Sequence, residues 1–454
     1  MSDNQASETK RMPAHLKSLR ADPDSGREID FQSPGERAPA VEPKFNRRRW
    51  IGLTLGIVLA IVVYLIMPAD VPHNAKLTAA TAVLMGAWWM TEAIPLPGTA
   101  LMPLIIFPTL GEEIEIKDVG AAYGNDVIFL FMGGFLLALA MQRWNLHRRI
   151  ALLVVRAMGP KPGGMIAGFM IATGFLSMWV SNTATAVMML PIGISVLILV
   201  AKLTAGKDPA QLEAAEAAAS AATEADPETE ADPVDGDTKT DAVQAITKTN
   251  FGTALMLGIA YAASVGSLGT LIGTPPNTLL AGYMRESHNV EIGFGEWMLV
   301  GVPLAVLMTF AVWFLLTKVL FKPEIKEIPG GRELMNEELE KLGPMSTGEK
   351  MVGAIFVLAA LSWVFIPVFW KGLISDAGIA MAVGFLLFVL PAGANRGVRL
   401  LDWATAVKLP WGVLLLFGGG LALSAQFSGS GLTEWIGESV SGTIASAMRP
   451  VTRM

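Results

Sequence analysis

A group of polar side chains interrupts one of the most apolar stretches of the chain. Ser177, Ser181, Asn182 and Thr183 lie in the middle of residues 163–200, which are otherwise apolar. Hydroxyl and amide groups at such a depth in hydrocarbon are costly unless protein, water or a ligand satisfies them. Uncharged oxygens suit a small hard cation, and backbone N–H groups at a helix break suit an anion. These residues are therefore candidate ligands.

A second polar interruption, in residues 269–277, lies within the apolar residues 251–285. Gly273 lets a backbone carbonyl approach a ligand closely, and the two prolines that follow Thr274 prevent the helix from simply continuing. We therefore expect a broken helix. Two interrupted segments that face each other near the bilayer midplane are typical of the binding site of a transporter.

The elements that position these residues are expected to be membrane-spanning helices. The chain is 52% hydrophobic and 16% charged, whereas soluble domains average about 25% charged residues. This composition predicts an all-α polytopic membrane protein. A crossing helix needs about 20 apolar residues, and we expect spans at 50–67, 77–93, 97–110, 126–142, 251–285 (broken), 295–320, 351–369, 374–392 and 409–427. The polar tip divides residues 163–200, which favours a re-entrant hairpin there.

Basic residues indicate the orientation. Arg47, Arg48 and Arg49 precede the first span, which predicts a cytoplasmic N-terminus in a multi-pass protein of the cytoplasmic (inner) membrane. The later basic clusters fall on the same side when the spans are counted, including the cluster in residues 143–149. We interpret that cluster as an anchor for topology and lipid headgroups rather than as a site that steers anions.

The chain divides into parts of different composition. Residues 208–242 hold eleven acidic residues against Lys239, and without an apolar face they are expected to be disordered. The expected parts are a disordered cytoplasmic tail at 1–49, the first span and first repeat at 50–322, an acidic disordered cytoplasmic insertion inside it at 205–248, a cytoplasmic linker at 323–349 and a partial second repeat at 350–454.

The two halves share a similar stretch. Residues 130–142 align with residues 414–426 at an offset of 284, and six of the thirteen positions are identical. By the span count the two copies run in opposite directions, so we expect an inverted repeat. Adding the offset to Ser181 places its counterpart near position 465, beyond residue 454. We therefore expect the second repeat to be incomplete in this chain, and the 454-residue chain alone not to transport.

Five motifs, in order along the chain, resemble the divalent anion/sodium symporter family. They are Trp88–Pro95, Phe129–Gly134, Gln142–Arg149, Ser181-Asn182-Thr183 and Gly273–Asn277. The resemblance covers about residues 50 to 440 apart from the acidic insertion. It implies a Ser-Asn-Thr hairpin tip and a broken helix in each repeat, where each pair binds one sodium ion. It also implies that both tips hold the carboxylates of a dicarboxylate, and that homodimers form through a scaffold past which a transport domain moves like an elevator.

Carried onto this chain, the resemblance assigns ligands to both interrupted segments. Sodium is expected to be held by Ser177, Ser181, Asn182 and the backbone near Gly273. Substrate contacts are expected from Asn182, Thr183 and Thr274. We also expect Ser177 and Ser181, four residues apart, to share one helical face. The alternative is that these small polar residues join helices through close packing and interhelical hydrogen bonds.

The expected function is uptake of a C4-dicarboxylate such as succinate, malate or fumarate, coupled to sodium as the transported co-substrate. Two neutral polar tips leave the sodium ion to supply positive charge. Exchange of dicarboxylates and transport of citrate or sulfate are alternatives, and a truncated, non-transporting membrane scaffold is an alternative of another class. The chain has no cysteine and no motif of a nucleotide-binding, zinc-protease or serine-hydrolase site, so we expect neither an enzyme nor a nucleic-acid partner.

Overall fold

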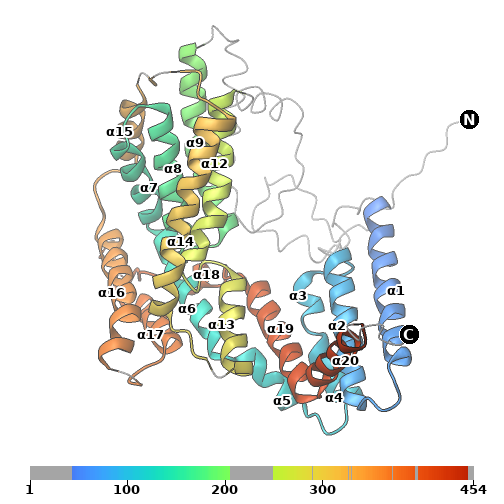
Figure 1. The fold of residues 1–454 in the computed structure, drawn as a ribbon. Coiled ribbons are helices and arrows are strands. Elements are labelled where there is room, and N and C mark those ends of the chain that lie inside the picture. Colours follow the sequence, from blue (N-terminus) through green and yellow to red (C-terminus); the bar gives the residue numbers. More distant parts are fainter. Residues whose placement is uncertain are drawn as a thin grey trace, which may run out of the picture.

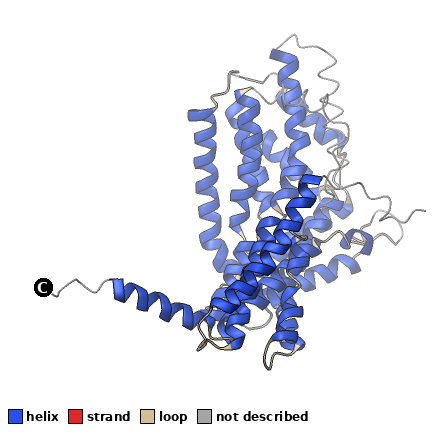
Figure 2. Cartoon of the chain, turned by 90° about the vertical axis from the view of Figure 1, so that its right-hand side faces the viewer, coloured by secondary structure: helices blue, strands red, loops and turns tan. Residues whose placement is uncertain are grey.

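The described part of the structure, a computed structural model, consists almost entirely of helices. It comprises residues 43–204, 249–288, 290–325, 327–328, 330–370, 372–393 and 397–447. Over these ranges no β-strand forms, and Figure 2 shows only helices and loops. The expected all-α fold is confirmed. The expected disorder of the N-terminal tail up to residue 42 and of the insertion 205–248 concerns residues outside the described ranges.

Within the described ranges, seven helices are long and apolar enough to cross a membrane. They are Phe45–Ile66, Ile116–Arg143, Asn182–Val200, Asn250–Gly269, Phe294–Leu320, Thr347–Phe369 and Trp411–Gly429. Three shorter apolar helices accompany them: Leu96–Leu110, Pro162–Ser177 and Asp376–Val389. The protein is therefore a multi-pass membrane protein, as its composition predicts.

The chain begins with two helices that lie side by side (Figure 1). Helix α1 (Pro43–Ile66) starts ahead of the predicted span, so the expectation of disorder is wrong for residues 43–49 of the tail. Helix α2 (His73–Thr91) runs back along α1. A Cβ atom on Gly56 would lie 2.5 Å from the Trp88 ring, so a glycine is needed where the two helices cross. The helices that follow are short: α3 (Leu96–Thr99), α4 (Met102–Leu110), α5 (Ile116–Ala121) and the 3₁₀ turn η2 (Ala122–Gly124).

The middle of the chain contains the hairpin and the broken helix. The elements in order are α6 (Asp126–Arg143), α7 (Leu146–Ala157), α8 (Pro162–Ser177), α9 (Asn182–Thr204), α12 (Asn250–Gly266), η3 (Ser267–Gly269), α13 (Pro275–His288), α14 (Phe294–Phe314) and the π-helical turn η4 (Leu315–Leu320). Helices α8 and α9 are the two arms of the predicted re-entrant hairpin. The predicted helix 251–285 is interrupted between α12 and α13, as expected.

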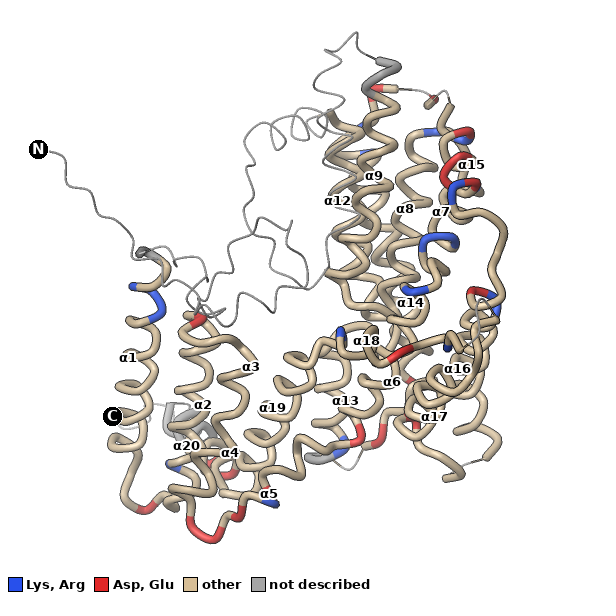
Figure 3. The backbone as a smooth tube through the Cα atoms, turned by 180° about the vertical axis from the view of Figure 1, so that it is seen from behind, with Lys and Arg blue, Asp and Glu red and all other residues tan. Residues whose placement is uncertain are grey.

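The last part of the chain returns to the same helical body. It consists of α15 (Gly331–Lys341), α16 (Thr347–Phe369), α17 (Asp376–Val389), α18 (Trp403–Ala406), α19 (Trp411–Gly429) and α20 (Leu432–Ala447). Figure 3 shows Lys and Arg on α7 and α15 toward the upper end of the molecule, where α15 also carries acidic residues, and at the start of α1 about halfway down. Acidic residues next to α4 and α5 lie toward the other end. The assignment of the first end to the cytoplasm stays a prediction.

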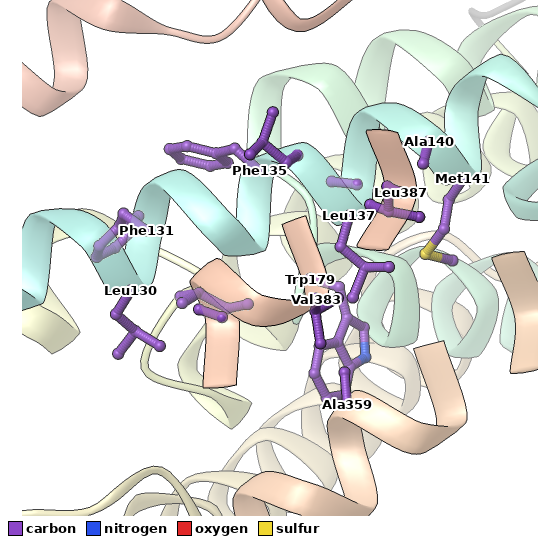
Figure 4. Close-up of a cluster of buried hydrophobic side chains, with 14 of the residues drawn as sticks. Leu130, Phe131, Phe135, Leu137, Ala140, Met141, Trp179, Ala359, Val383 and Leu387 are labelled. Carbon is purple, nitrogen blue, oxygen red and sulfur yellow. The ribbon is translucent and has the colours of Figure 1, made fainter. Parts of the chain in front are cut away.

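Two large hydrophobic clusters hold the middle and last parts together. The shaft cluster is formed by α7, α8, α9 and α12, with Met165, Phe169 and Phe251 among its buried members. The tip cluster is formed by α6, α16 and α17, together with Trp179 and Val180 from the connection between α8 and α9. In Figure 4, Trp179 lies close to Val383 and Ala359 below α6. The hairpin is therefore embedded in one cluster along its arms and in the other at its tip.

Glycines allow the two halves to interlock closely. A Cβ atom on Gly133 of α6 would lie 2.4 Å from the backbone of Ala380 on α17. A Cβ atom on Gly419 of α19 would lie 2.2 Å from the carbonyl oxygen of Ala100, beside α3. In each case a glycine of one half receives the backbone of the other half. The relation of the halves by an inverted repeat stays a prediction.

Candidate functional site

The hairpin turns at a four-residue tip, residues 178–181, between Ser177 and Asn182. Ser177 ends α8 and is fully buried. Its hydroxyl oxygen lies 2.5 Å from the carbonyl oxygen of Ala263 on α12 and 3.0 Å from the Asn182 Oδ1 atom, so its single proton is shared between two acceptors. The structure therefore brings two of the predicted sodium ligands together, and ties them to the broken helix.

Ser181 has a different place from the one expected. The helix stops at Ser177, so Ser177 and Ser181 do not share one helical face, and that interpretation is wrong. The chain must reverse direction here, and the residues between the two serines form the turn. Ser181 instead starts α9: its hydroxyl accepts from the Ala184 N–H at 3.3 Å, and its carbonyl oxygen accepts from the Thr185 N–H at 2.9 Å.

The broken helix is interrupted over residues 267–274. After the 3₁₀ turn the backbone becomes extended at Thr270 (φ −133°, ψ 162°), and α13 begins at Pro275. Gly273 is buried, and a Cβ atom on it would lie 2.2 Å from the carbonyl oxygen of Ser267. Because real Cβ atoms do not approach an oxygen so closely, only glycine fits at this point of the unwound segment.

Side chains that were not among the predicted site residues hold this segment in place. The Asn277 amide is buried and donates to the carbonyl oxygens of Ser267 at 2.9 Å and Thr270 at 2.8 Å. The Thr278 hydroxyl donates to the Leu271 carbonyl oxygen at 2.5 Å. The sequence shows only that Asn277 directly follows two prolines, and this position does not indicate which carbonyl groups accept its hydrogen bonds.

The hairpin tip and the broken helix are in direct contact. The Thr270 hydroxyl donates to the carbonyl oxygen of Met178 in the tip. Farther along, a Cβ atom on Gly266 would lie 2.3 Å from the Gly174 carbonyl oxygen, so the two backbones touch. The expectation that the two interruptions face each other is met at this point. Among the hydrogen bonds of the described residues, none joins the side chains of Thr183 or Thr274 to the other predicted ligands.

The candidate substrate residues lie at the accessible side of this assembly. Asn182 and Thr274 are partly exposed and Thr183 is exposed, whereas Ser177 and Gly273 are buried. Asn182 opens α9, where the first-turn N–H groups favour an anion. At the start of α13 two prolines remove donors, so α9 is the stronger of the two helix ends in this respect.

The site carries no charged side chain. Residues 173–185 and 263–278 contain neither Asp, Glu, Lys nor Arg. The available groups are hydroxyls, an amide and backbone carbonyls, which are oxygen ligands suited to a hard cation. Burying an anion here without a compensating charge would cost several kcal/mol or more. A cation bound beside the anion would offset part of this cost.

An aromatic cluster anchors the tip. The Trp179 ring stacks on Phe294 and Trp363, with centroids 6.0 and 6.3 Å apart, and meets Phe356 edge-on at 4.7 Å. Phe294 begins α14, and the other two rings belong to α16. Aromatic pairs in these geometries each contribute about 0.5–1.5 kcal/mol beyond the area that they bury. The hairpin tip of the first half is thus fixed against a helix of the second half.

The arginines of residues 143–149 contact acidic residues of the chain itself, and their expected role as an anchor for topology and lipid headgroups stays a prediction. Arg143 pairs with Asp402 at 2.5 Å, Arg148 with Glu338 at 2.8 Å, and Arg149 with Glu349. Arg148 and Arg149 lie on α7, Glu338 on α15 and Glu349 at the start of α16. They fasten the linker between the halves to the helix that leads into the hairpin.

Charge around Glu338 favours its ionised form. Burial of this carboxyl opposes ionisation, but the neighbouring Lys341 and Arg148 outweigh that effect and hold its pKa below the usual value. Lys341 lies 2.5 Å from one carboxylate oxygen and Arg148 lies 2.8 Å from the other. The contact between α7 and α15 is therefore ionic at neutral pH.

Comparison with known proteins identifies the family. The family described as the sodium:sulfate symporter transmembrane region matches residues 47–454. The sodium-dependent dicarboxylate transporter SdcS of Staphylococcus saprophyticus is 40% identical over 401 residues, which are 87% of this chain and 70% of that protein. The transporter of the same name from Staphylococcus aureus (strain USA300) is 39% identical over the same shares of the two chains. The chain belongs to the sodium:sulfate symporter family, the divalent anion/sodium symporters, and is a member of a transporter family rather than an enzyme.

Proposed function

We propose that the protein imports C4-dicarboxylates, such as succinate, malate or fumarate, together with sodium across the cytoplasmic membrane. The observation that carries this proposal is a contact between two interrupted segments whose ligands are all neutral. In such a site, cations beside a dianion reduce the cost of burying its charge. Relatives that are 39–40% identical are named sodium-dependent dicarboxylate transporters, which supports both the ion and the class of substrate.

The predicted ligands take two roles in this proposal. Ser177, Ser181 and Asn182, with the backbone carbonyl of Gly273, hold one sodium ion. Asn182, Thr183 and Thr274 contact the carboxylates of the substrate. Asn182 serves both, because its oxygen faces the buried serine while its own position at the start of α9 is partly exposed.

Sodium binds first in the proposed sequence. The hydrogen bonds from the Ser177 hydroxyl to Asn182 and to the Ala263 carbonyl oxygen give way to coordination of the ion by oxygen atoms. Its positive charge then offsets the cost of desolvating a carboxylate at the neighbouring helix end, where interactions between charges are stronger than in water. Without sodium the substrate would leave uncompensated negative charge in the membrane. Coupling thus follows from the neutrality of the site.

The movement in this proposal is that of an elevator. The shaft cluster, with the hairpin arms and α12, forms one packed body. It carries the tip past α6, α16 and α17, which belong to the scaffold, and each of the two inverted repeats contributes to the scaffold and to the moving part. Homodimers form through the scaffold, and the N-terminus is cytoplasmic. Contacts between Trp179 and α16 are then the ones that change during transport.

The test is uptake of labelled succinate by proteoliposomes that contain the complete gene product. Uptake is measured in sodium and with choline in place of sodium, at equal osmolarity. We expect accumulation in sodium and none above empty vesicles in choline, and we expect malate and fumarate to compete. Undiminished uptake in choline would contradict sodium coupling. Stronger competition by citrate or sulfate than by fumarate would contradict the proposed substrate.

A further inference from the structure

The carbonyl groups of the unwound segment are not equally available to a ligand. Four of them accept hydrogen bonds from side chains. The acceptors are Ser267 and Thr270, both from Asn277, then Leu271 from Thr278 and Leu268 from the Trp297 indole at 2.9 Å. The carbonyls of Ile272 and Gly273 are not among the acceptors of these side chains. The side-chain hydrogen bonds therefore hold the first part of the segment.

Asn277 is the central donor of this arrangement. It is 4% exposed, and both of its amide bonds run back across the break, to residues ten and seven positions earlier. A loop of this length with extended backbone has many conformations of similar energy, and fixing it in advance lowers the entropy cost of binding. The amide therefore orders the segment before any ligand arrives.

Thr270 continues the connection to the hairpin. Its carbonyl oxygen accepts from Asn277, and its hydroxyl donates to the Met178 carbonyl oxygen next to Ser177. Thr270 is fully buried, so no water can take over either contact. One chain of hydrogen bonds thus runs from the start of α13 through the unwound segment to the hairpin tip.

We propose that Asn277 and Thr270 are positioning residues that fix the unwound segment against the hairpin tip, and that this fastening sets the affinity of the protein for sodium. The inference rests on the proposed sodium site at Ser177 and Gly273. Neither residue is assigned a contact with the ion. Each acts through the backbone that it holds, so its loss weakens sodium binding more than it weakens the later binding of substrate.

The absence of cysteine from the chain permits a readout that does not depend on transport. Ser264 is exposed and directly follows Ala263, whose carbonyl oxygen lies against Ser177. In the variant Ser264→Cys of the complete protein, with any cysteine outside these 454 residues replaced by serine, we measure the rate of maleimide labelling against sodium concentration. Bound sodium orders the contact between α8 and α12, so it is expected to slow labelling. The midpoint of that effect reports the affinity for sodium.

Two substitutions test the proposal on this background. Asn277→Leu removes both amide bonds, and Thr270→Val removes the hydroxyl while keeping the shape of the side chain. We expect each to raise the sodium midpoint roughly 5- to 30-fold, the equivalent of one or two lost hydrogen bonds. Thr270→Ser keeps the hydroxyl and should stay within about twofold of the parent. Asn74→Leu is the matched control, because its amide also donates to a backbone carbonyl, that of Glu112, away from the site.

The outcomes separate this inference from the proposed function. Sodium midpoints unchanged in both Asn277→Leu and Thr270→Val would overturn the positioning role. Faster labelling of these variants without sodium, with the same midpoint, would show a merely structural role and would also overturn it. No effect of sodium on the parent would instead refute the sodium site itself. In uptake assays, the sodium requirement should rise while the KM for succinate at saturating sodium changes little.

Discussion

Replacing Asn182 with alanine should abolish uptake and leave the fold nearly unchanged. Its Oδ1 atom accepts only part of one hydrogen bond, because the Ser177 proton is shared with the Ala263 carbonyl oxygen at 2.5 Å. After the substitution that proton still has its closer acceptor. The lost bond is therefore expected to cost about 1 kcal/mol of folding free energy or less.

The cost to transport is larger because Asn182 is proposed to contact two charged species. A hydrogen bond or ligand contact to a charged group contributes about 1.5–3 kcal/mol. Losing one such contact to sodium and one to substrate costs about 3–6 kcal/mol, a fall of at least about 100-fold in uptake at limiting concentrations. The contrast between a small effect on stability and a large effect on uptake is the signature of a ligand.

The assay compares initial rates of succinate uptake per milligram of reconstituted protein, with thermal unfolding of the same preparation in detergent. Asn74→Ala serves as the control. Its amide, in the first turn of α2, bonds to the backbone of Glu112 after α4, away from the site, so the substitution should change neither quantity much. Uptake by Asn182→Ala within threefold of the parent would refute the assignment. A loss of uptake that is matched by unfolding would support the alternative, in which the polar residues only join helices.

Three further predictions concern the surroundings of the site. Ser177→Ala should chiefly raise the sodium concentration for half-maximal uptake, by roughly 5- to 30-fold, with the maximal rate retained; an unchanged requirement would remove Ser177 from the ligands. Arg149→Met should destabilise the protein by about 3–5 kcal/mol in thermal unfolding, because Glu349 is 3% exposed and would lose its partner. Adding Glu349→Gln to this variant should recover part of the lost stability, and no recovery would contradict a buried ion pair. Because the pKa of Glu338 is lowered, the stabilisation by its carboxylate is complete above the ordinary pKa of 4.5 and is lost as the pH falls below that value. Cleavage of the linker by an acid-tolerant protease should therefore rise only below pH 4.5. A rise in cleavage already near neutral pH would contradict this prediction.

The interrupted elements were predictable from the sequence because their signals are local. A polar tip divides residues 163–200, and two prolines follow Gly273, so a hairpin and a broken helix were the expected result. The ends of helices are less predictable. Four-residue spacing suggested one helical face for Ser177 and Ser181, but the position of the turn, which depends on packing of both arms, ends the helix at Ser177.

The residues that were missed act through partners distant in the sequence. Asn277 looks like any amide at the start of a helix until its acceptors across the break are known. Trp179 looks like a core residue of the hairpin, whereas its rings stack on α14 and α16. The partner of Arg149, Glu349, lies 200 residues away, so the sequence gives no sign of this ion pair. Contacts between residues so far apart in the sequence depend on the whole fold, and a local sequence pattern does not predict them.

The most direct test of sodium-coupled uptake measures the fluxes of labelled sodium and labelled succinate together in the same proteoliposomes. The vesicles contain the complete gene product and are either empty or preloaded with unlabelled succinate. The account predicts that succinate enters empty vesicles and that sodium enters with it in a fixed ratio, with both fluxes abolished by Asn182→Ala. Succinate entry only into preloaded vesicles, without sodium flux, would contradict the account and identify an exchanger.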